Sequence, residues 1–159
     1  MNSKNKFLYF FSLVLIFLTT SCHKENVAQK SKMELLTGTR WQFYILLYEQ
    51  PPGSTPIDYS SGLFLQCELD DIFQFKQDGS FISSQNTIMC NPSHTDVLTY
   101  YDGGGWSLSQ GDTLDLTAGL NKQTFLLSSI TTTDLELKQT SADYFQNLYT
   151  YRFQFKATP

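Results

Sequence analysis

The sequence predicts an all-β fold, an eight-stranded up-and-down antiparallel barrel that follows a short helix. Three observations lead to this prediction. Short segments rich in aromatic and β-branched residues recur after residue 38, turn residues separate them, and tight connections alternate with longer ones. Charged residues make up only 16% of the 159 residues and aromatic residues 15%, which excludes an intrinsically disordered chain. The length fits a single domain.

The predicted helix lies just before the first strand. Ser31 is suited to cap its N-terminus, and Met33, Leu35 and Leu36 give it an apolar side. Gly38 is suited to end it in a left-handed turn.

Eight segments have the composition of strands. They are residues 39–48, 71–76, 80–88, 104–109, 113–117, 124–131, 135–139 and 148–156. The strongest hairpin signal is Asp78-Gly79 between the second and third segments. A two-residue turn there places Gln77 opposite Ser80.

The connections differ in length in a regular way. Those at Asp78-Gly79, residues 110–112 and residues 132–134 are tight, whereas residues 49–70 and 89–103 are long. In an up-and-down barrel, alternate connections lie at opposite ends. The predicted barrel is therefore a cup with one end closed by turns and one end carrying long loops.

The first residues have the features of an export signal. Lys4 and Lys6 precede an apolar run over residues 7–18, which is too short to span a bilayer, and small residues then lead to Cys22. This pattern resembles a bacterial lipobox. We expect a signal peptide over residues 1–21, a lipidated tether over 22–30 and the barrel domain over 31–159. The alternative is an ordinary signal peptide with an unmodified thiol at Cys22.

The other two cysteines are expected to form a disulfide. If Cys22 carries acyl chains, such as palmitate, then Cys67 and Cys90 remain as a pair in an oxidising compartment. Continuing the hairpin register outward from the predicted turn places these two cysteines opposite each other. We expect attachment to the outer membrane, and the sequence does not decide between its periplasmic and its surface face.

Composition argues against several functions. The 11 basic and 15 acidic residues leave no basic field for nucleic acid. No Cys-x-x-Cys pair or Gly-x-Ser-x-Gly motif occurs, and His94, within residues 93–96, is the only plausible acid or base. We therefore expect neither an enzyme nor a metal or cofactor site. Glu68, Asp70 and Asp71 are interpreted as solvated or turn-capping acids.

An ordered set of short motifs resembles the lipocalin-like domain of small lipoproteins from Bacteroidota-type bacteria. It includes Leu35-Leu36-Thr37-Gly38 before Trp41, Cys67-Glu68-Leu69-Asp70-Asp71, Asp78-Gly79, Cys90 and Gly105-Trp106-Ser107-Leu108. The match covers residues 34–156, although two residues rather than the usual one separate the glycine from Trp41. The resemblance implies a small barrel that binds an apolar molecule. In true lipocalins an arginine of the last strand stacks on the early tryptophan, but the parity of Arg152 places it on the polar face.

The barrel interior is predicted to be aromatic. In the last strand, Tyr149, Tyr151, Phe153 and Phe155 share one face. The candidate ligand-binding interior consists of Trp41, Phe43, Phe73, Phe75, Ile82, Trp106, Phe125, Tyr151 and Phe153. Two interpretations remain open, because these rings either fill the barrel as a core or line a cavity for a small hydrophobic ligand.

The long loops provide further candidates. Tyr100 and Tyr101, before three glycines, lie on a predicted mouth loop, where they cover an entrance, meet a partner or simply pack. The leading expectation is a barrel that binds an apolar molecule. The alternative is a filled barrel that serves as a protein-interaction or inhibitor module of the cell envelope, with residues 49–62 and 89–103 as its contact surface.

Overall fold

The computed structural model describes residues 30–90 and 97–159, and it confirms the predicted eight-stranded antiparallel barrel. Cys22 and the predicted signal peptide lie outside the described residues, as does His94. The elements in chain order are α2 (Lys32–Thr37), β1 (Arg40–Glu49), β2 (Ile57–Asp58), α3 (Ser60–Leu63), β3 (Ile72–Phe75), β4 (Phe81–Ser84), a 3₁₀ turn η1 (Thr99–Tyr101), β5 (Gly105–Leu108), β6 (Thr113–Ala118), β7 (Asn121–Ile130), β8 (Asp134–Ala142) and β9 (Leu148–Thr158).

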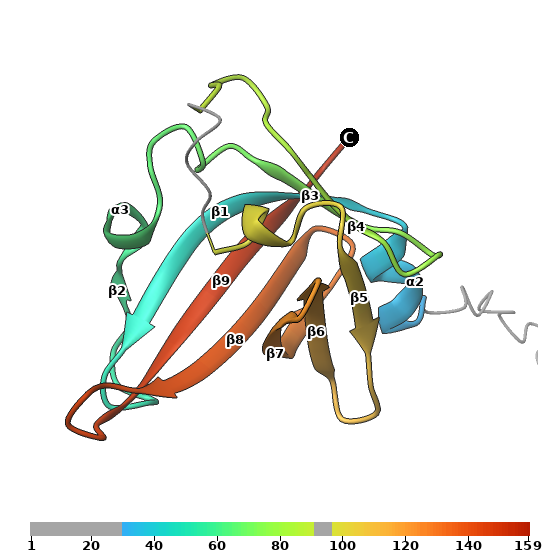
Figure 1. The fold of residues 1–159 in the computed structure, drawn as a ribbon. Helices are drawn as coiled ribbons and strands as arrows, with labels where there is room; N and C mark the ends of the chain where they lie inside the picture. The colour runs from blue at the N-terminus through green and yellow to red at the C-terminus, as the bar shows by residue number, and fades with distance from the viewer. Residues whose placement is uncertain (1–29, 91–96) are drawn as a thin grey trace, which may run out of the picture.

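The strands form one continuous sheet that curls toward closure (Figure 1). The eight barrel strands follow the order β4-β3-β1-β9-β8-β7-β6-β5, with the first and last long strands, β1 and β9, side by side, and the two-residue strand β2 pairs with the end of β1 outside this order. The two edge strands meet through an isolated bridge between Ser80 and Gly105. There, the amide of Phe81 donates to the carbonyl of Gly104 at 2.9 Å. The barrel is therefore nearly closed, which leaves little unpaired edge.

Helix α2 begins with the predicted cap. The Ser31 hydroxyl accepts from the amide of Glu34, and the Glu34 carboxylate accepts from the amide of Ser31, which forms a capping box. The end of the helix differs from the prediction. Gly38 has φ −86° and ψ 0°, so it is not in a left-handed turn, because its own amide bonds to the Glu34 carbonyl in the right-handed region. Leu36 is buried, and its carbonyl accepts from the indole nitrogen of Trp41 at 3.2 Å.

The alternation of connection lengths is confirmed. The tight turns β3–β4, β5–β6 and β7–β8 are each closed by a backbone hydrogen bond. The ammonium group of Lys32 contacts the carboxylate of Asp112 at 2.5 Å, so α2 lies at this closed end. The long connections lie at the other end. They contain three short elements that the sequence did not predict, namely β2, α3 and η1.

The hairpin turn between β3 and β4 is one residue longer than predicted. The amide of Lys76 bonds to the carbonyl of Ser80 at 2.9 Å, so three residues, 77–79, form the turn. Gly79 has φ +83°, and the Asp78 carboxylate accepts from the amide of Ser80 at 2.9 Å. This is the geometry of a three-residue hairpin that ends in a left-handed glycine.

The longer turn changes which residues face the interior. Phe75 is opposite Phe81, and Ile72 is opposite Ser84. Phe81 is therefore buried, with 1% of its surface exposed, whereas Ile82 is 38% exposed. The prediction that Ile82 lines the interior is wrong, because a slip of one residue moves every side chain to the other face.

The predicted disulfide between Cys67 and Cys90 is confirmed, with Cα atoms 5.3 Å apart. It does not arise from a continuous ladder, since β3 and β4 pair only as far as Ile72 and Ser84. The bond instead joins the two long connections beyond the end of the hairpin.

Candidate binding site at the open end of the barrel

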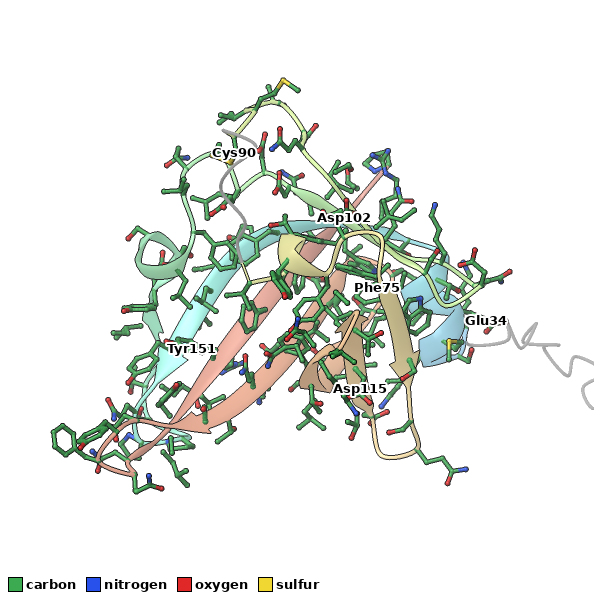
Figure 2. All side chains as sticks on the ribbon, in the orientation of Figure 1. Glu34, Phe75, Cys90, Asp102, Asp115 and Tyr151 are labelled. Atoms are coloured by element: carbon green, nitrogen blue, oxygen red, sulfur yellow. A yellow bond between two sulfur atoms is a disulfide. The ribbon has the colours of Figure 1, made fainter. Side chains whose placement is uncertain are left out.

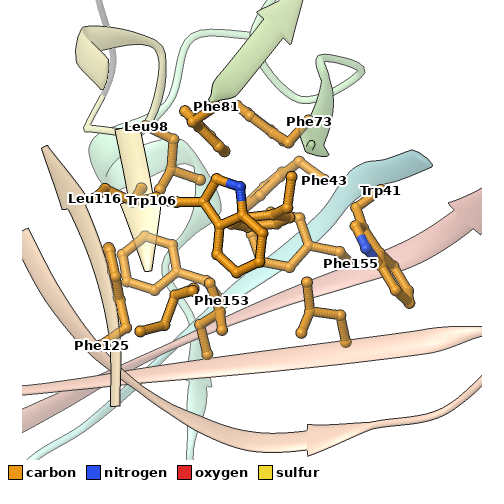
Figure 3. Close-up of a cluster of buried hydrophobic side chains, with 14 of the residues drawn as sticks. Trp41, Phe43, Phe73, Phe81, Leu98, Trp106, Leu116, Phe125, Phe153 and Phe155 are labelled. Atoms are coloured by element: carbon orange, nitrogen blue, oxygen red, sulfur yellow. The ribbon is translucent and has the colours of Figure 1, made fainter. Parts of the chain in front are cut away.

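Most of the predicted interior residues form a packed core (Figure 3). The buried ones are Trp41, Phe43, Phe73, Phe75, Trp106, Phe125 and Phe153. Several of their rings meet edge to face. The Phe125 and Phe153 centroids are 5.5 Å apart at 87°, and those of Phe75 and Trp106 are 5.4 Å apart at 82°. This geometry is the favoured one for buried aromatic pairs, and it explains how so many rings fill one barrel.

Side chains from the long connections close this core at the open end. Phe64, which follows α3, lies 4.4 Å from Phe43 and 6.4 Å from Phe153 between ring centroids. Leu98 and Tyr101, around η1, are buried in the same cluster. Burial raises the pKa of the Tyr101 hydroxyl. The predicted mouth loop thus places one of its tyrosines inside the barrel.

The neighbouring Tyr100 lies on the surface. Its hydroxyl accepts a hydrogen bond at 2.6 Å from the side-chain amide of Asn121, at the start of β7. The adjoining glycines have a packing role, because a Cβ atom at Gly104 would lie 2.0 Å from the carbonyl oxygen of Thr117. The backbone of the loop therefore approaches β6 as closely as only glycine permits.

Beyond the core lies a group of partly exposed tyrosines, three on the inner faces of β1 and β9 and one just before α3. We call Tyr48, Tyr59, Tyr149 and Tyr151 the tyrosine cluster. The centroid of Tyr48 lies 5.5 Å from that of Tyr59 and 5.5 Å from that of Tyr151, and the Tyr149 and Tyr151 centroids are 5.3 Å apart. Figure 2 labels Tyr151 on the part of β9 beyond the core.

The position of the cluster follows from strand length. Strand β1 pairs with β3 only over Arg40–Gln42, whereas its pairing with β9 continues to Glu49. The inner face of β1 and β9 therefore extends beyond the hairpin that covers it elsewhere. Partial burial raises the pKa of Tyr151, and repulsion from the neighbouring tyrosines adds to this effect. Partial burial also raises the pKa of Tyr48, and the negative charge of Asp143 and the neighbouring tyrosines add to this effect.

This arrangement offers flat apolar ring faces with hydroxyl groups at their edges. The rings are in contact with water on one side and with the aromatic core on the other, since Tyr151 lies 6.3 Å from Phe153 between centroids. Such a surface suits a ligand that is largely apolar and carries a few polar groups. Among the predicted ligand-binding residues, Tyr151 is the one that the structure places here.

Arg152 lies on the outer face, as its parity predicts. Its Nη2 atom contacts Glu136 Oε2 at 2.7 Å, and its Nη1 atom contacts Glu49 Oε1 at 3.0 Å. Burial raises the pKa of Glu136, but hydrogen bonds from Arg152 and Gln154 more than offset this and hold the pKa below its ordinary value. Hydrogen bonds from the Gly53 amide and from Arg152 lower the pKa of Glu49. Arg152 therefore joins β1, β8 and β9 and does not stack on Trp41.

A groove of about 560 Å³ lies beside this ion network. Outward-facing side chains of β6–β9 form its floor, and the loop after β1 forms a wall. Three of its threonine hydroxyl groups bond to protein partners, because the hydroxyl oxygens of Thr140 and Thr150 lie 2.9 Å apart and the hydroxyl of Thr124 donates to Asp115 at 2.7 Å. The volume is in the range of ligand pockets. The lining does not single out a ligand class.

Of the three acidic residues before β3, Glu68 caps a turn, whereas Asp70 bonds to the other long connection, and two of the three are not solvated. Glu68 and Asp71 are buried. The Glu68 carboxylate accepts from the amide of Leu65 at 2.6 Å, and that of Asp70 accepts from the amides of Thr87 and Ile88. Within residues 30–90 and 97–159, no group of three or more potential ligands is placed to hold a metal ion.

The chain matches no protein-family model and no curated protein. In the described part of the chain, no helix has the length and apolar character needed to cross a membrane.

Proposed function

We propose that this protein is a lipoprotein of the bacterial outer membrane, held by acyl chains on Cys22, whose barrel binds a small apolar molecule. The observation that carries the proposal is the tyrosine cluster. It continues the aromatic interior to the open end of the barrel and leaves ring faces in contact with water. A ligand with an apolar surface gains free energy there by replacing that water.

The loops around the cluster support a binding role. Tyr59 precedes α3 and stacks against Tyr151 with centroids 6.1 Å apart, and Phe64 follows α3 and packs into the core. The segment between them therefore touches both the solvent-exposed rings and the closed interior. Small movements of this segment would change the size of the site without unfolding the barrel.

Native mass spectrometry of the mature protein, extracted from membranes in mild detergent, tests ligand binding. We expect an adduct of a few hundred daltons that leaves on gentle activation. Tyr151→Ala should lose the adduct. Tyr144→Ala removes an exposed ring from the loop after β8 and is the matched control that should keep it. A wild-type protein without an adduct, or one whose adduct survives in Tyr151→Ala, contradicts binding at the cluster.

The anchor has its own test. Palmitate labelling of cells that produce the wild-type protein should label the mature chain and place it in the outer-membrane fraction. Cys22→Ser should remove both the label and the membrane association, while Cys67→Ser should leave the label in place. An unlabelled wild-type protein in the soluble fraction contradicts the anchor.

A second function, contact with a protein of the cell envelope, is favoured by a different observation. The loop between β8 and β9 exposes two adjacent aromatic rings to water. This loop is not one of the two long connections from which such contact was expected.

A further inference from the structure

The five residues 143–147 join β8 to β9 and include Tyr144 and Phe145. Tyr144 is 92% exposed and Phe145 is 79% exposed. The two rings meet edge to face with centroids 5.5 Å apart. We call this loop the aromatic tip. Its rings add nothing to the core, so the fold does not require them.

The backbone of the aromatic tip is held by one carboxylate. Asp143 Oδ1 accepts from the amide of Phe145 at 2.8 Å and from the amide of Asn147 at 2.9 Å. Asp143 Oδ2 accepts from the side-chain amide of Asn147 at 3.0 Å. A backbone bond from the amide of Asp143 to the carbonyl of Asn147 closes the turn. The rings are thus presented on an ordered turn, which lowers the entropic cost of binding through them.

The position of the aromatic tip favours a partner away from the anchored end. The described chain begins at Lys30 beside α2, which contacts the closed end through Lys32 and Asp112. The aromatic tip lies at the other end of β8 and β9 (Figure 1). A ten-residue strand such as β1 is roughly 33 Å long. With the proposed anchor at Cys22, the aromatic tip points away from the membrane that holds the protein.

The charge of the aromatic tip also argues against a lipid surface. Residues 140–151 contain no lysine or arginine, and their only charged side chain is Asp143. Loops and helices that bind anionic bilayers combine apolar residues with basic ones. In a symmetric contact between two copies, Asp143 of one aromatic tip would face Asp143 of the other, which disfavours a second copy as the partner.

We infer that the aromatic tip is a docking surface for another protein of the cell envelope, which receives Tyr144 and Phe145 in an apolar cleft with a neutral or basic rim. Exposed aromatic side chains that act as anchors account for much of the binding free energy of protein interfaces. This inference uses the proposed anchor for its orientation but does not depend on the proposed ligand.

Site-specific photo-cross-linking in intact cells of the source organism tests the inference. The full-length chain carries a benzophenone amino acid in place of Phe145, which keeps an aromatic ring at that position. The control carries the same probe in place of the exposed Thr132, in the tight turn between β7 and β8. We expect one main protein adduct from position 145 and none from position 132. The cross-linked peptide of the partner should be apolar.

Second-site variants separate recognition from proximity. With the probe at position 145, Tyr144→Ser should lower the adduct yield by about 30-fold, as expected for a ring that contributes about 2 kcal/mol. Tyr144→Phe should retain most of the yield. Asp143→Ala should lower the yield while keeping both rings, because the turn loses its order. Tyr144 is exposed, so its variants should unfold at the temperature of the wild-type protein.

Four results overturn the inference: no adduct, an adduct with lipid, an adduct with a second copy of this chain, or a protein adduct whose yield is unchanged in Tyr144→Ser. Each is distinguishable from failure of the proposed function. Palmitate labelling of Cys22 and the ligand adduct lost in Tyr151→Ala are measured independently of the cross-link.

Discussion

Arg152 Nη2 lies 2.7 Å from Glu136 Oε2, and the same guanidinium contacts Glu49 Oε1 at 3.0 Å. The two carboxylates come from β8 and β1, and the arginine comes from β9 between them. Both acids are largely buried, whereas the side chain of Arg152 is 26% exposed. This ion network joins β8, β9 and β1, and so it ties the first and last long strands of the chain together in the middle of the sheet.

Arg152→Met should destabilise the protein by about 2 kcal/mol, because it leaves two largely buried carboxylates without their cation. The estimate is below the value for fully buried pairs, since Arg152 is partly exposed. Lys156→Met is the matched control. Lys156 is on the same strand as Arg152, and its ion pair with Asp134 of β8 is about half exposed, so its loss should cost much less than the loss of Arg152. Urea unfolding of both variants measures the difference, and equal effects would contradict the role of the network.

The same network predicts a loss of stability in acid. The pKa values of Glu49 and Glu136 are lowered in the folded state from their ordinary value of 4.5. The unfolded chain therefore binds protons first as the pH falls. The stabilisation is complete above about pH 5 and is lost as the pH falls through the lower folded-state pKa values. Unfolding free energies between pH 7 and pH 3 measure this slope, and the slope should be smaller in Glu136→Gln than in the wild-type protein.

The alternating strand pattern and the connection lengths are local properties, so the sequence was sufficient to predict the eight-stranded barrel with its long connections at one end. The turn at Asp78-Gly79 was not predictable in the same way. Asp-Gly suits a two-residue turn with both residues left-handed and also a three-residue turn that ends in a left-handed glycine. The hydrogen bond from the amide of Trp106 to the carbonyl of Gly79 holds this turn, but it joins segments far apart in the sequence and forms only in the complete barrel.

The burial of residues in the long connections could not be predicted from the sequence either. Phe64 and Leu98 lie in irregular segments with no periodicity, and their burial depends on where the loops cross the barrel. The aromatic tip carried a usable signal, since Asp143 and Asn147 are turn-forming residues that flank two aromatic ones. Two large rings inside such a turn indicate exposure.

The hairpin register predicts that alanine substitutions at the neighbouring residues Phe81 and Ile82 differ strongly in their effect on stability. Phe81→Ala should cost about 4 kcal/mol, because it leaves a cavity beside Phe73 and Phe75, whose ring centroids lie 6.0 Å and 5.2 Å from that of Phe81. Ile82→Ala should cost less than about 1 kcal/mol, because Ile82 faces solvent. Thermal and urea unfolding of the two neighbouring variants give the comparison. The reverse order of stabilities would restore the two-residue turn.

The disulfide should contribute mainly through the unfolded chain. Cys67 and Cys90 are separated by 23 positions, and a loop of that length is expected to stabilise the fold by about 3 kcal/mol. The double variant Cys67→Ala/Cys90→Ala should lose this amount. Addition of a reductant should destabilise the wild-type protein in urea and leave the double variant unchanged. A reductant effect on the double variant would show that the loss has another origin.

The tyrosine cluster predicts an alkaline limit to both stability and ligand binding. The pKa values of Tyr48 and Tyr151 are raised above their ordinary value of 10.0, so the folded state holds these protons more tightly than the unfolded chain. The stabilisation is complete below about pH 10 and is lost as the pH rises through the folded-state values. Unfolding free energies between pH 8 and pH 11 should therefore fall in the wild-type protein and fall less in Tyr48→Phe/Tyr151→Phe.

Ionised rings would also carry negative charge toward a bound apolar molecule. Retention of the ligand adduct should thus decline over the same interval in the wild-type protein, and an equal decline in the double variant would place the responsible groups elsewhere.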